Sequence, residues 1–401
     1  MKTDLRNTAV FMIGGLAVGH SVFHWIIQSF VVLLPEIQQT FGLSAIAIGG
    51  LLASRELSSG IIRLPGGIIS DMLRTYWGVL LSVCLLVCGL GALAIGISPR
   101  YVFLLGGIAL LSMAHSVWHL PSSASLSYHF PTHRGLALSF HGVGGSVGDV
   151  AGPAVTGILL MIFSWQGIIN LYAVAPFVLG LLALWSFYRI GRIREKNLVS
   201  RPISYLFATK QLLADPVLWG LTVIRGLRGM SLVALVTVLP LYLANDLGIS
   251  PFGRGIHIGL LIAIGLFAKP IAGFCSDRWG RKTILVPGLV WSSAMALVLI
   301  PLDQGVGLTI SIALLGVFLY PDQPILTAAT LEIIGTNVSA TALGMATFAS
   351  FIMASASPII AGFLYQHFGM DLALYYISAL FAAAALMMVL IPLRSRVIIS
   401  S

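Results

Sequence analysis

Four histidines occur as two pairs, and in each pair the members are four residues apart. His20 and His24 lie in the first long apolar run, and His115 and His119 lie in the fourth. This spacing places both rings of a pair on one face of a helix and is also a metal-ligand spacing. We expect the four rings to hydrogen-bond the substrate and to carry coupling protons. A bound transition ion and simple packing between helices are the alternatives. No carboxylate or thiolate accompanies them on those helices, so we expect no metal and no cofactor.

Two arginines fall inside the seventh apolar run. Arg225 and Arg228 lie about ten and thirteen residues into it, near mid-bilayer and on one helical face. Ionisable residues at this depth are costly and normally face a cavity or a partner. We expect both guanidiniums to bind an anionic substrate, a carboxylate or an organophosphate, through bidentate hydrogen bonds. Permanent pairing with Asp322, Glu56 or Asp149 is the alternative.

A third arginine and three acids complete the set of candidate residues. Arg55 lies near the middle of the second run beside Glu56, and neighbours on a helix point about 100° apart. We therefore expect Arg55 to face the substrate and Glu56 to face another helix. Asp322, Asp149 and Glu56 are candidates for proton coupling, because burial and nearby arginines shift a carboxyl group's proton affinity. A purely structural role stays open for Asp149.

The composition is that of a membrane protein. Of 401 residues, 58% are hydrophobic and 9% are charged, against about 25% charged in soluble domains, and the mean hydropathy is +0.99. A spanning helix needs about 20 apolar residues. The sequence predicts twelve such helices in a lipid bilayer, near 9–35, 45–72, 77–97, 101–127, 135–163, 168–188, 215–244, 255–276, 283–302, 306–331, 337–366 and 371–393.

The positive charges predict the orientation. If the N-terminus is cytoplasmic, the segments on the outer side of the membrane carry only two basic residues, Arg100 and Arg254. The inside segments carry Lys2, Arg6, Arg74, Arg134, Arg189, Arg192, Arg194, Lys196, Arg201, Lys210, Arg278, Arg281, Lys282, Arg394 and Arg396. This asymmetry predicts a multi-pass protein of the cytoplasmic membrane with both termini inside. Topology explains the net charge of +9, and no nucleic-acid partner is implied.

The chain repeats itself across its midpoint. The stretch Gly67–Asp71 returns as Gly273–Asp277, and Pro153–Gly157 returns as Pro358–Gly362 at almost the same offset. Parallel repeats of this kind build transporters whose substrate site lies between two halves. We predict an all-α membrane protein with one six-helix bundle over 1–188, a cytoplasmic linker over 189–214 and a second bundle over 215–401.

The repeated segment resembles a known loop signature. The run Gly273-Phe-Cys-Ser-Asp277-Arg278-Trp-Gly280-Arg281-Lys282 is similar to the loop between helices 8 and 9 of the major facilitator superfamily. The first copy keeps the glycine, the aspartate and a basic residue but has Tyr76-Trp77 where a glycine and a basic residue are expected. The resemblance implies that these residues control closure on the cytoplasmic side: Asp71, Arg74, Asp277, Arg278 and Arg281.

Two shorter likenesses concern the fourth and fifth helices. The stretch Gly148–Gly157 resembles the fifth-helix motif associated with antiporters in this superfamily. Together, His119-Leu-Pro121, Arg134-Gly135 and Gly144-Gly145 resemble bacterial fosmidomycin-resistance members. Proton-driven efflux of drugs or metabolites is therefore one functional alternative.

The expected function is gradient-driven transport. The sequence has no phosphate-binding glycine-rich loop ending in Lys-Ser or Lys-Thr, no Gly-x-Ser-x-Gly elbow and no His-Glu-x-x-His. We therefore expect that the protein is not an enzyme. We predict a proton-coupled secondary transporter of a small organic anion, working by alternating access. A monomer suffices because one chain supplies both halves of the site. A membrane sensor or scaffold that has lost transport is the alternative from another class.

Overall fold

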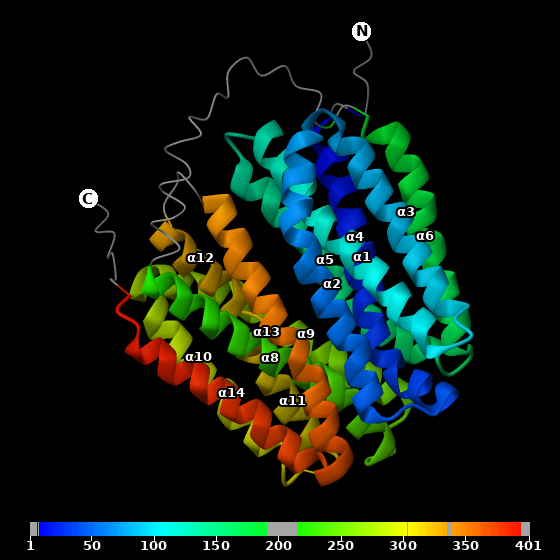
Figure 1. Cartoon of the computed structure of the whole chain (residues 1–401), viewed down its shortest axis with the longest axis vertical. Helices are drawn as coiled ribbons and strands as arrows, with labels where there is room; N and C mark the ends of the chain where they lie inside the picture. Colours follow the sequence, from blue (N-terminus) through cyan, green and yellow to red (C-terminus); the bar gives the residue numbers. More distant parts are fainter. Residues whose placement is uncertain are drawn as a thin grey trace. The chain divides into compact units, whose positions relative to one another are not determined.

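The computed structural model describes residues 6, 8–188, 190, 215–302, 304–334 and 339–393 (Figure 1). Within this part of the chain the regular structure is helical and contains no strand. The helices are α1 (Ala9–Phe41), α2 (Ala45–Met72), η2 (Arg74–Tyr76), α3 (Trp77–Gly96), α4 (Tyr101–His129), α5 (Arg134–Leu159), α6 (Trp165–Ser186), α8 (Pro216–Asn245), α9 (Pro251–Trp279), α10 (Arg281–Val298), α11 (Val306–Leu319), α12 (Asp322–Ile334), α13 (Ser339–Phe368) and α14 (Met370–Leu390).

In the described part of the chain, each of the twelve predicted apolar runs is mostly helical. Within the described residues, ten segments are long and apolar enough to cross a membrane, and the α11–α12 pair counts as one of them. The glycine-rich α5 and the 18-residue α10 fall outside that set. The predicted all-α fold is confirmed for the described residues, whereas the predicted linker at 189–214 lies outside them apart from Ile190.

The tenth run differs from the prediction, because it is broken into two helices. Helix α11 ends at Leu319 and α12 begins at Asp322, with Pro321 between them. Proline lacks a backbone N–H and disfavours helical backbone at the residue before it. The break leaves carbonyl oxygens at the end of α11 without helical partners and puts Asp322 in the first turn of α12.

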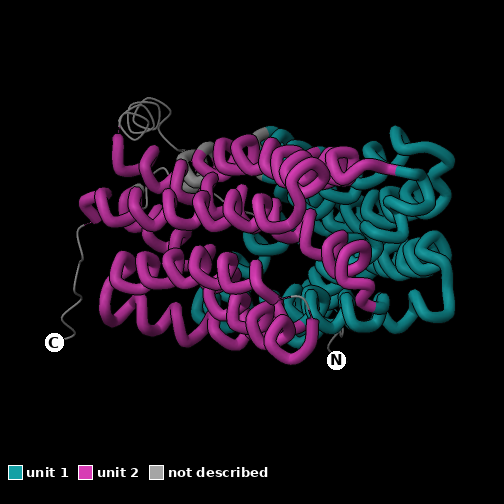
Figure 2. Tube along the Cα trace, turned by 90° about the horizontal axis from the view of Figure 1, so that it is seen from below, with its two compact units in different colours: residues 1–42, 54–196, 250–259 teal, residues 43–53, 197–249, 260–401 magenta. Residues whose placement is uncertain are grey.

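The chain forms two compact units (Figure 2). Unit 1 comprises residues 1–42, 54–196 and 250–259, and unit 2 comprises residues 43–53, 197–249 and 260–401. The first turns of α2 therefore belong with unit 2, and the first turns of α9 belong with unit 1.

The same helix pairs pack together inside each unit. In unit 1, α1 packs on α5, and α3 packs on α4 and α6. In unit 2, α8 packs on α13, and α10 packs on α11 and α14. The first helix of each unit thus pairs with its fifth, and the third pairs with its fourth and sixth. This recurrence is the pseudo-symmetry predicted from the repeated segments.

The two loop signatures fold differently. In the second copy, Gly280 alone joins α9 to α10, and its φ of 96° is a conformation that favours glycine. The first copy lacks a glycine at that point. There the three-residue helix η2 (Arg74–Tyr76) makes the connection between α2 and α3.

Candidate functional site

The four predicted histidines lie together in unit 1. The Nε2 atom of His115 lies 3.3 Å from His24 Nε2 and 3.0 Å from His119 Nε2. The ring of His20 meets the rings of His24 and His119 edge to face, with centroids 4.5 and 4.8 Å apart. Helices α1 and α4 therefore direct both histidine pairs to one place, as the i, i+4 spacings predict.

Asp149 on α5 joins this group. Its Oδ1 accepts a hydrogen bond from His24 Nδ1 at 2.7 Å and one from Gln28 Nε2 at 3.1 Å. The runs that carry the histidines contain no carboxylate, and the acid comes from a third helix, α5. Asp149 therefore contacts two side chains of α1 and does more than support its own helix.

Small residues on α5 make this contact possible. A Cβ atom added at Gly148 would collide with the carbonyl oxygen of Ser21 and would lie 3.0 Å from His24 Cβ. Helices α1 and α5 therefore approach each other backbone to backbone, which a larger residue would prevent. Because of this close packing, Asp149 reaches His24.

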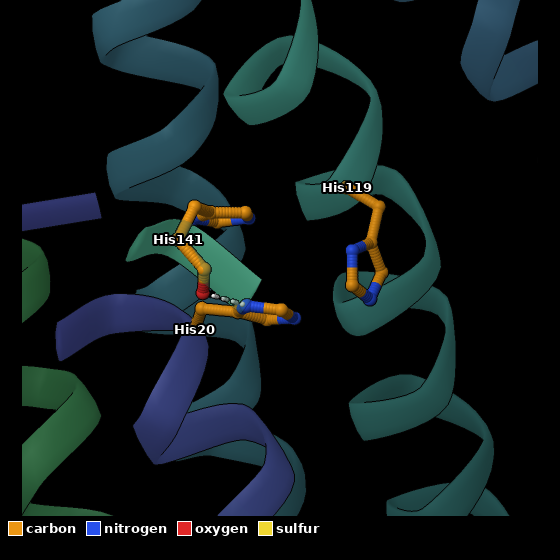
Figure 3. Close-up of side chains that lie close together, drawn as sticks. All are labelled: His20, His119 and His141. Atoms are coloured by element: carbon orange, nitrogen blue, oxygen red, sulfur yellow. Dashed lines mark hydrogen bonds between the residues drawn. The ribbon is translucent and has the colours of Figure 1, made fainter. Parts of the chain in front are cut away.

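A fifth histidine was missed by the sequence analysis. His141 on α5 stacks on His20, with ring centroids 4.1 Å apart and planes 10° apart, and its carbonyl oxygen lies 2.8 Å from His20 Nδ1 (Figure 3). In the sequence His141 precedes Gly145, Gly148 and Gly152 at helical intervals. It therefore shares the face of α5 that packs on α1, and this is the signal that could have identified it.

Arg55 and Glu56, which were expected to face different neighbours, are paired with each other. Arg55 Nε and Nη2 both lie 2.9 Å from Glu56 Oε1. The long arginine side chain bends across the 100° that separates the two Cα–Cβ directions. Glu56 thus neutralises the charge that was expected to face the substrate.

In unit 2, Arg228 forms a buried ion pair. Its Nε lies 2.6 Å from Asp322 Oδ2, and the two side chains are 7% and 1% exposed. Its Nη2 also donates to the carbonyl oxygen of Leu319, one of the carbonyls left by the break between α11 and α12. Pairing with Asp322 is the alternative that the sequence left open for Arg228, and Pro321 makes both acceptors available.

Arg225 lies on the same face of α8 and also contacts α12. Its Nη2 lies 3.2 Å from Thr327 Oγ1 and 3.5 Å from Thr330 Oγ1. The two arginines share one face of α8, as the i, i+3 spacing predicts, and both contact α12. The two threonines, which the sequence analysis did not identify, add hydroxyl groups to a site that already holds two guanidiniums and a carboxylate.

The C-terminal loop signature forms a network around Arg281. Its guanidinium hydrogen-bonds Asp277, Ser276 Oγ at 2.7 Å, and Glu332 Oε1 at 3.0 and 2.8 Å. Glu332, at the end of α12, was not predicted. Arg278 is exposed.

In the N-terminal copy of the signature, the guanidinium of Arg74 lies over the rings of Trp77 and Tyr128, at 5.5 and 5.0 Å. The side chain of Asp71 lies outside what the structure describes.

Comparison with known proteins gives weak but consistent sequence similarity. The chain is 23% identical over 267 residues to a "Probable nitrate transporter NarT" of Staphylococcus epidermidis, which covers 67% of this chain and 66% of the relative. It is 23% identical over 305 residues to the "Fosmidomycin resistance protein" of Escherichia coli, covering 74% and 73%. The first alignment thus spans just under two thirds of the relative's own length.

Solved structures of transporters share the fold. The nucleoside transporter NupG superposes with a TM-score of 0.77 at 14% identity, over 95% of this chain and 99% of that one. A D-xylose-proton symporter gives 0.75 at 17% identity over 95% and 97%. A bacterial homolog of the human lysosomal transporter Spinster gives 0.74 at 14% identity over 95% of each chain.

A family model covers nearly the whole sequence. The model of the Major Facilitator Superfamily matches residues 16–353 and 221–398. This match agrees with the repeated helix pairs, the loop signature and the membrane-spanning helices described above. The chain is a multi-pass membrane protein that belongs to the Major Facilitator Superfamily of transporters.

Proposed function

We propose that this protein is a proton-coupled secondary transporter of a small organic anion, such as a carboxylate or an organophosphate. The observation that carries the proposal is the buried Arg228–Asp322 ion pair, with Arg225 on the same face of α8. Arginine suits a carboxylate or phosphate because its planar fork donates two parallel hydrogen bonds. The Thr327 and Thr330 hydroxyls accept hydrogen bonds from Arg225 while each donates its own proton to a carbonyl of α12, so they position the guanidinium for such an anion.

The ion pair also supplies a way to couple the anion to protons. A buried ion pair is stable only while both charges have partners. An anion that binds Arg228 displaces Asp322, and the displaced carboxylate becomes easier to protonate. Protonation of Asp322 in turn releases Arg228 for the anion. The two binding events therefore favour each other, and this linkage is reciprocal.

The comparisons support the anion class in part. Nitrate, which the name of the Staphylococcus epidermidis relative contains, is an oxyanion. We further propose that the protein is a monomer in the bacterial cytoplasmic membrane with both termini inside. The halves at 1–188 and 215–401 would expose the site to each side in turn, with the loop residues around Arg281 controlling closure. Arg55, matched by Glu56, has a weaker claim to the substrate than Arg225.

Thermal stabilisation of the detergent-purified protein tests the anion class. A ligand present at 100 times its dissociation constant adds about 2.7 kcal/mol of stability, so a panel of carboxylates, organophosphates, cationic drugs and apolar drugs can be screened. We expect an anion to stabilise the parent and the control Arg100→Ala, whose side chain is exposed. The same anion should no longer stabilise Arg225→Ala.

A transport assay tests the coupling. Proteoliposomes should accumulate the stabilising anion when the pH gradient drives protons in the same direction, and Asp322→Asn should abolish this dependence on the gradient. Uptake that ignores the gradient in the parent would refute proton coupling while leaving the anion site intact.

Efflux of drugs or metabolites is the second candidate function. It is favoured by the Gly148–Gly157 motif on α5 and by the similarity to the fosmidomycin resistance protein. The same panel separates the two functions. Stabilisation by cationic or apolar drugs, equal in the parent and in Arg225→Ala, would favour efflux and overturn the anion proposal.

A further inference from the structure

Three histidine side chains in unit 1 converge with the spacing of metal ligands. The Nε2–Nε2 distances are 3.3 Å between His24 and His115 and 3.0 Å between His115 and His119. All three ligand atoms lie within 4.8 Å of one another. Around a tetrahedral zinc ion with Zn–N distances of about 2.05 Å, neighbouring ligand nitrogens are about 3.3 Å apart. We call these three residues the histidine site.

Hydrogen bonds alone cannot give every ring nitrogen of the histidine site a partner. His24 Nδ1 donates its proton to Asp149 Oδ1 at 2.7 Å, so His24 Nε2 presents a lone pair. His115 Nε2 carries either one proton or one lone pair. It can therefore make a linear hydrogen bond to only one of its two nitrogen neighbours, His24 or His119. A cation at the centre would be bound by all three nitrogens.

His20 adds a fourth nitrogen beside the site. Its Nδ1 lies 2.8 Å from the carbonyl oxygen of His141, an acceptor, which places the ring proton on Nδ1. Its Nε2 is buried and has no hydrogen-bond partner among the described residues. In Figure 3 the rings of His20 and His141 lie parallel and point toward His119. A buried lone pair without a donor is costly, and a bound cation nearby would supply its partner.

We propose that the histidine site binds a divalent transition-metal ion of the zinc, cobalt and nickel class. Imidazole nitrogen suits these ions, whereas magnesium and calcium require oxygen ligands. Asp149 acts as the positioning residue, since metal-ligating histidines usually donate their second ring N–H to a carboxylate. The proposal goes beyond the anion transport proposed above and uses none of the residues of unit 2.

The surroundings of the site admit such an ion. All three ligand residues are partly exposed, and the side chain of His24 is 22% exposed. The charges of Arg55 and Arg63 act on His115, which opposes a cation. Glu56 offsets them through its ion pair with Arg55 and its attraction to Arg63, and Asp149 adds a negative charge in direct contact with His24.

Cobalt is the probe for the test, because tetrahedral Co²⁺ absorbs visible light. The full chain, purified in detergent without a histidine tag and stripped with a chelator, is titrated with CoCl₂, and bound metal is counted by elemental analysis. We expect about one ion per chain. Affinity should fall at least tenfold in His115→Gln and in His119→Gln, and about 10- to 100-fold in Asp149→Asn. The control His367→Ala, an exposed histidine on α13, should bind like the parent.

A second readout separates lost binding from lost folding. Zn²⁺ should raise the thermal unfolding midpoint of the parent and of Arg225→Ala but leave that of His115→Gln unchanged, while the metal-free midpoints stay similar. Absence of cobalt binding by the parent would overturn the proposal. Binding that is equally strong in all the histidine variants and in Asp149→Asn would also overturn it, because the ion would then be held elsewhere.

Discussion

At the scale of single residues, the Arg228–Asp322 ion pair allows the first prediction. Both side chains are almost fully buried, so Asp322→Ala would leave a guanidinium without its counter-charge. We expect a loss of about 3–5 kcal/mol in the free energy of unfolding, measured by thermal unfolding in detergent. An Asp322→Ala protein as stable as the parent would show that Arg228 finds another anion or water.

The matched control removes both charges. Replacing a buried pair by apolar side chains of similar volume is often neutral or stabilising. The double variant Arg228→Met/Asp322→Leu should therefore recover most of the stability that Asp322→Ala loses. It should still fail to couple anion uptake to protons, which separates the structural role of the pair from its role in transport.

Spacing along one helix was easy to interpret from the sequence, and contacts between helices were not. The i, i+4 histidines and the i, i+3 arginines share faces as predicted, because helix geometry alone determines this. The contact of Asp149 with His24 depends on the packing of α5 against α1, which no single helix encodes. The Arg55–Glu56 pair depends on side-chain flexibility, which backbone directions do not describe.

At the scale of elements, the close packing of α1 and α5 gives the second prediction. A Cβ at Gly148 would collide with the backbone of Ser21, whereas a Cβ at Gly142, on the same helix, would meet nothing within 4 Å. Gly148→Ala should therefore destabilise the protein by about 1–3 kcal/mol through overpacking. Gly142→Ala should be neutral or stabilising by up to about 1 kcal/mol, because alanine has the higher helix propensity. Equal unfolding midpoints for the two variants would contradict the tight contact.

The helices themselves were largely predictable from runs of apolar residues, because a spanning helix must satisfy its backbone within the segment. The break at Pro321 was not predicted, since apolar content continues across it. Prolines also lie inside many helices of this chain, including Pro35 in α1 and Pro65 in α2. Proline alone therefore does not mark a helix end here. At the break beside Pro321, the Leu319 carbonyl and the Asp322 carboxylate both accept hydrogen bonds from Arg228.

At the scale of the whole molecule, the network around Arg281 gives the third prediction. Asp277 and Glu332 are 68% and 56% exposed, and exposed ion pairs contribute less than about 1 kcal/mol. Glu332→Gln should therefore leave the unfolding midpoint nearly unchanged. If the loop signature controls closure, the same variant should slow transport in proteoliposomes several-fold. Transport at the parent's rate would remove Glu332 from the closure mechanism.

The orientation of the molecule gives the last prediction, and α4 provides the matched pair of positions. Arg100 precedes the helix and Thr132 follows it, both exposed. The 29 residues of α4 extend about 43 Å at 1.5 Å per residue, more than the hydrocarbon core of about 30 Å. The two positions should therefore lie on opposite sides of the membrane.

The native Cys84 and Cys88 are buried, and Cys275→Ser removes the third cysteine. In that background, a membrane-impermeant maleimide should label Arg100→Cys in intact cells and Thr132→Cys only after lysis, as the positive-inside asymmetry requires. The reverse pattern would invert the topology and place the Arg281 network on the outer side, where it could not control a cytoplasmic gate.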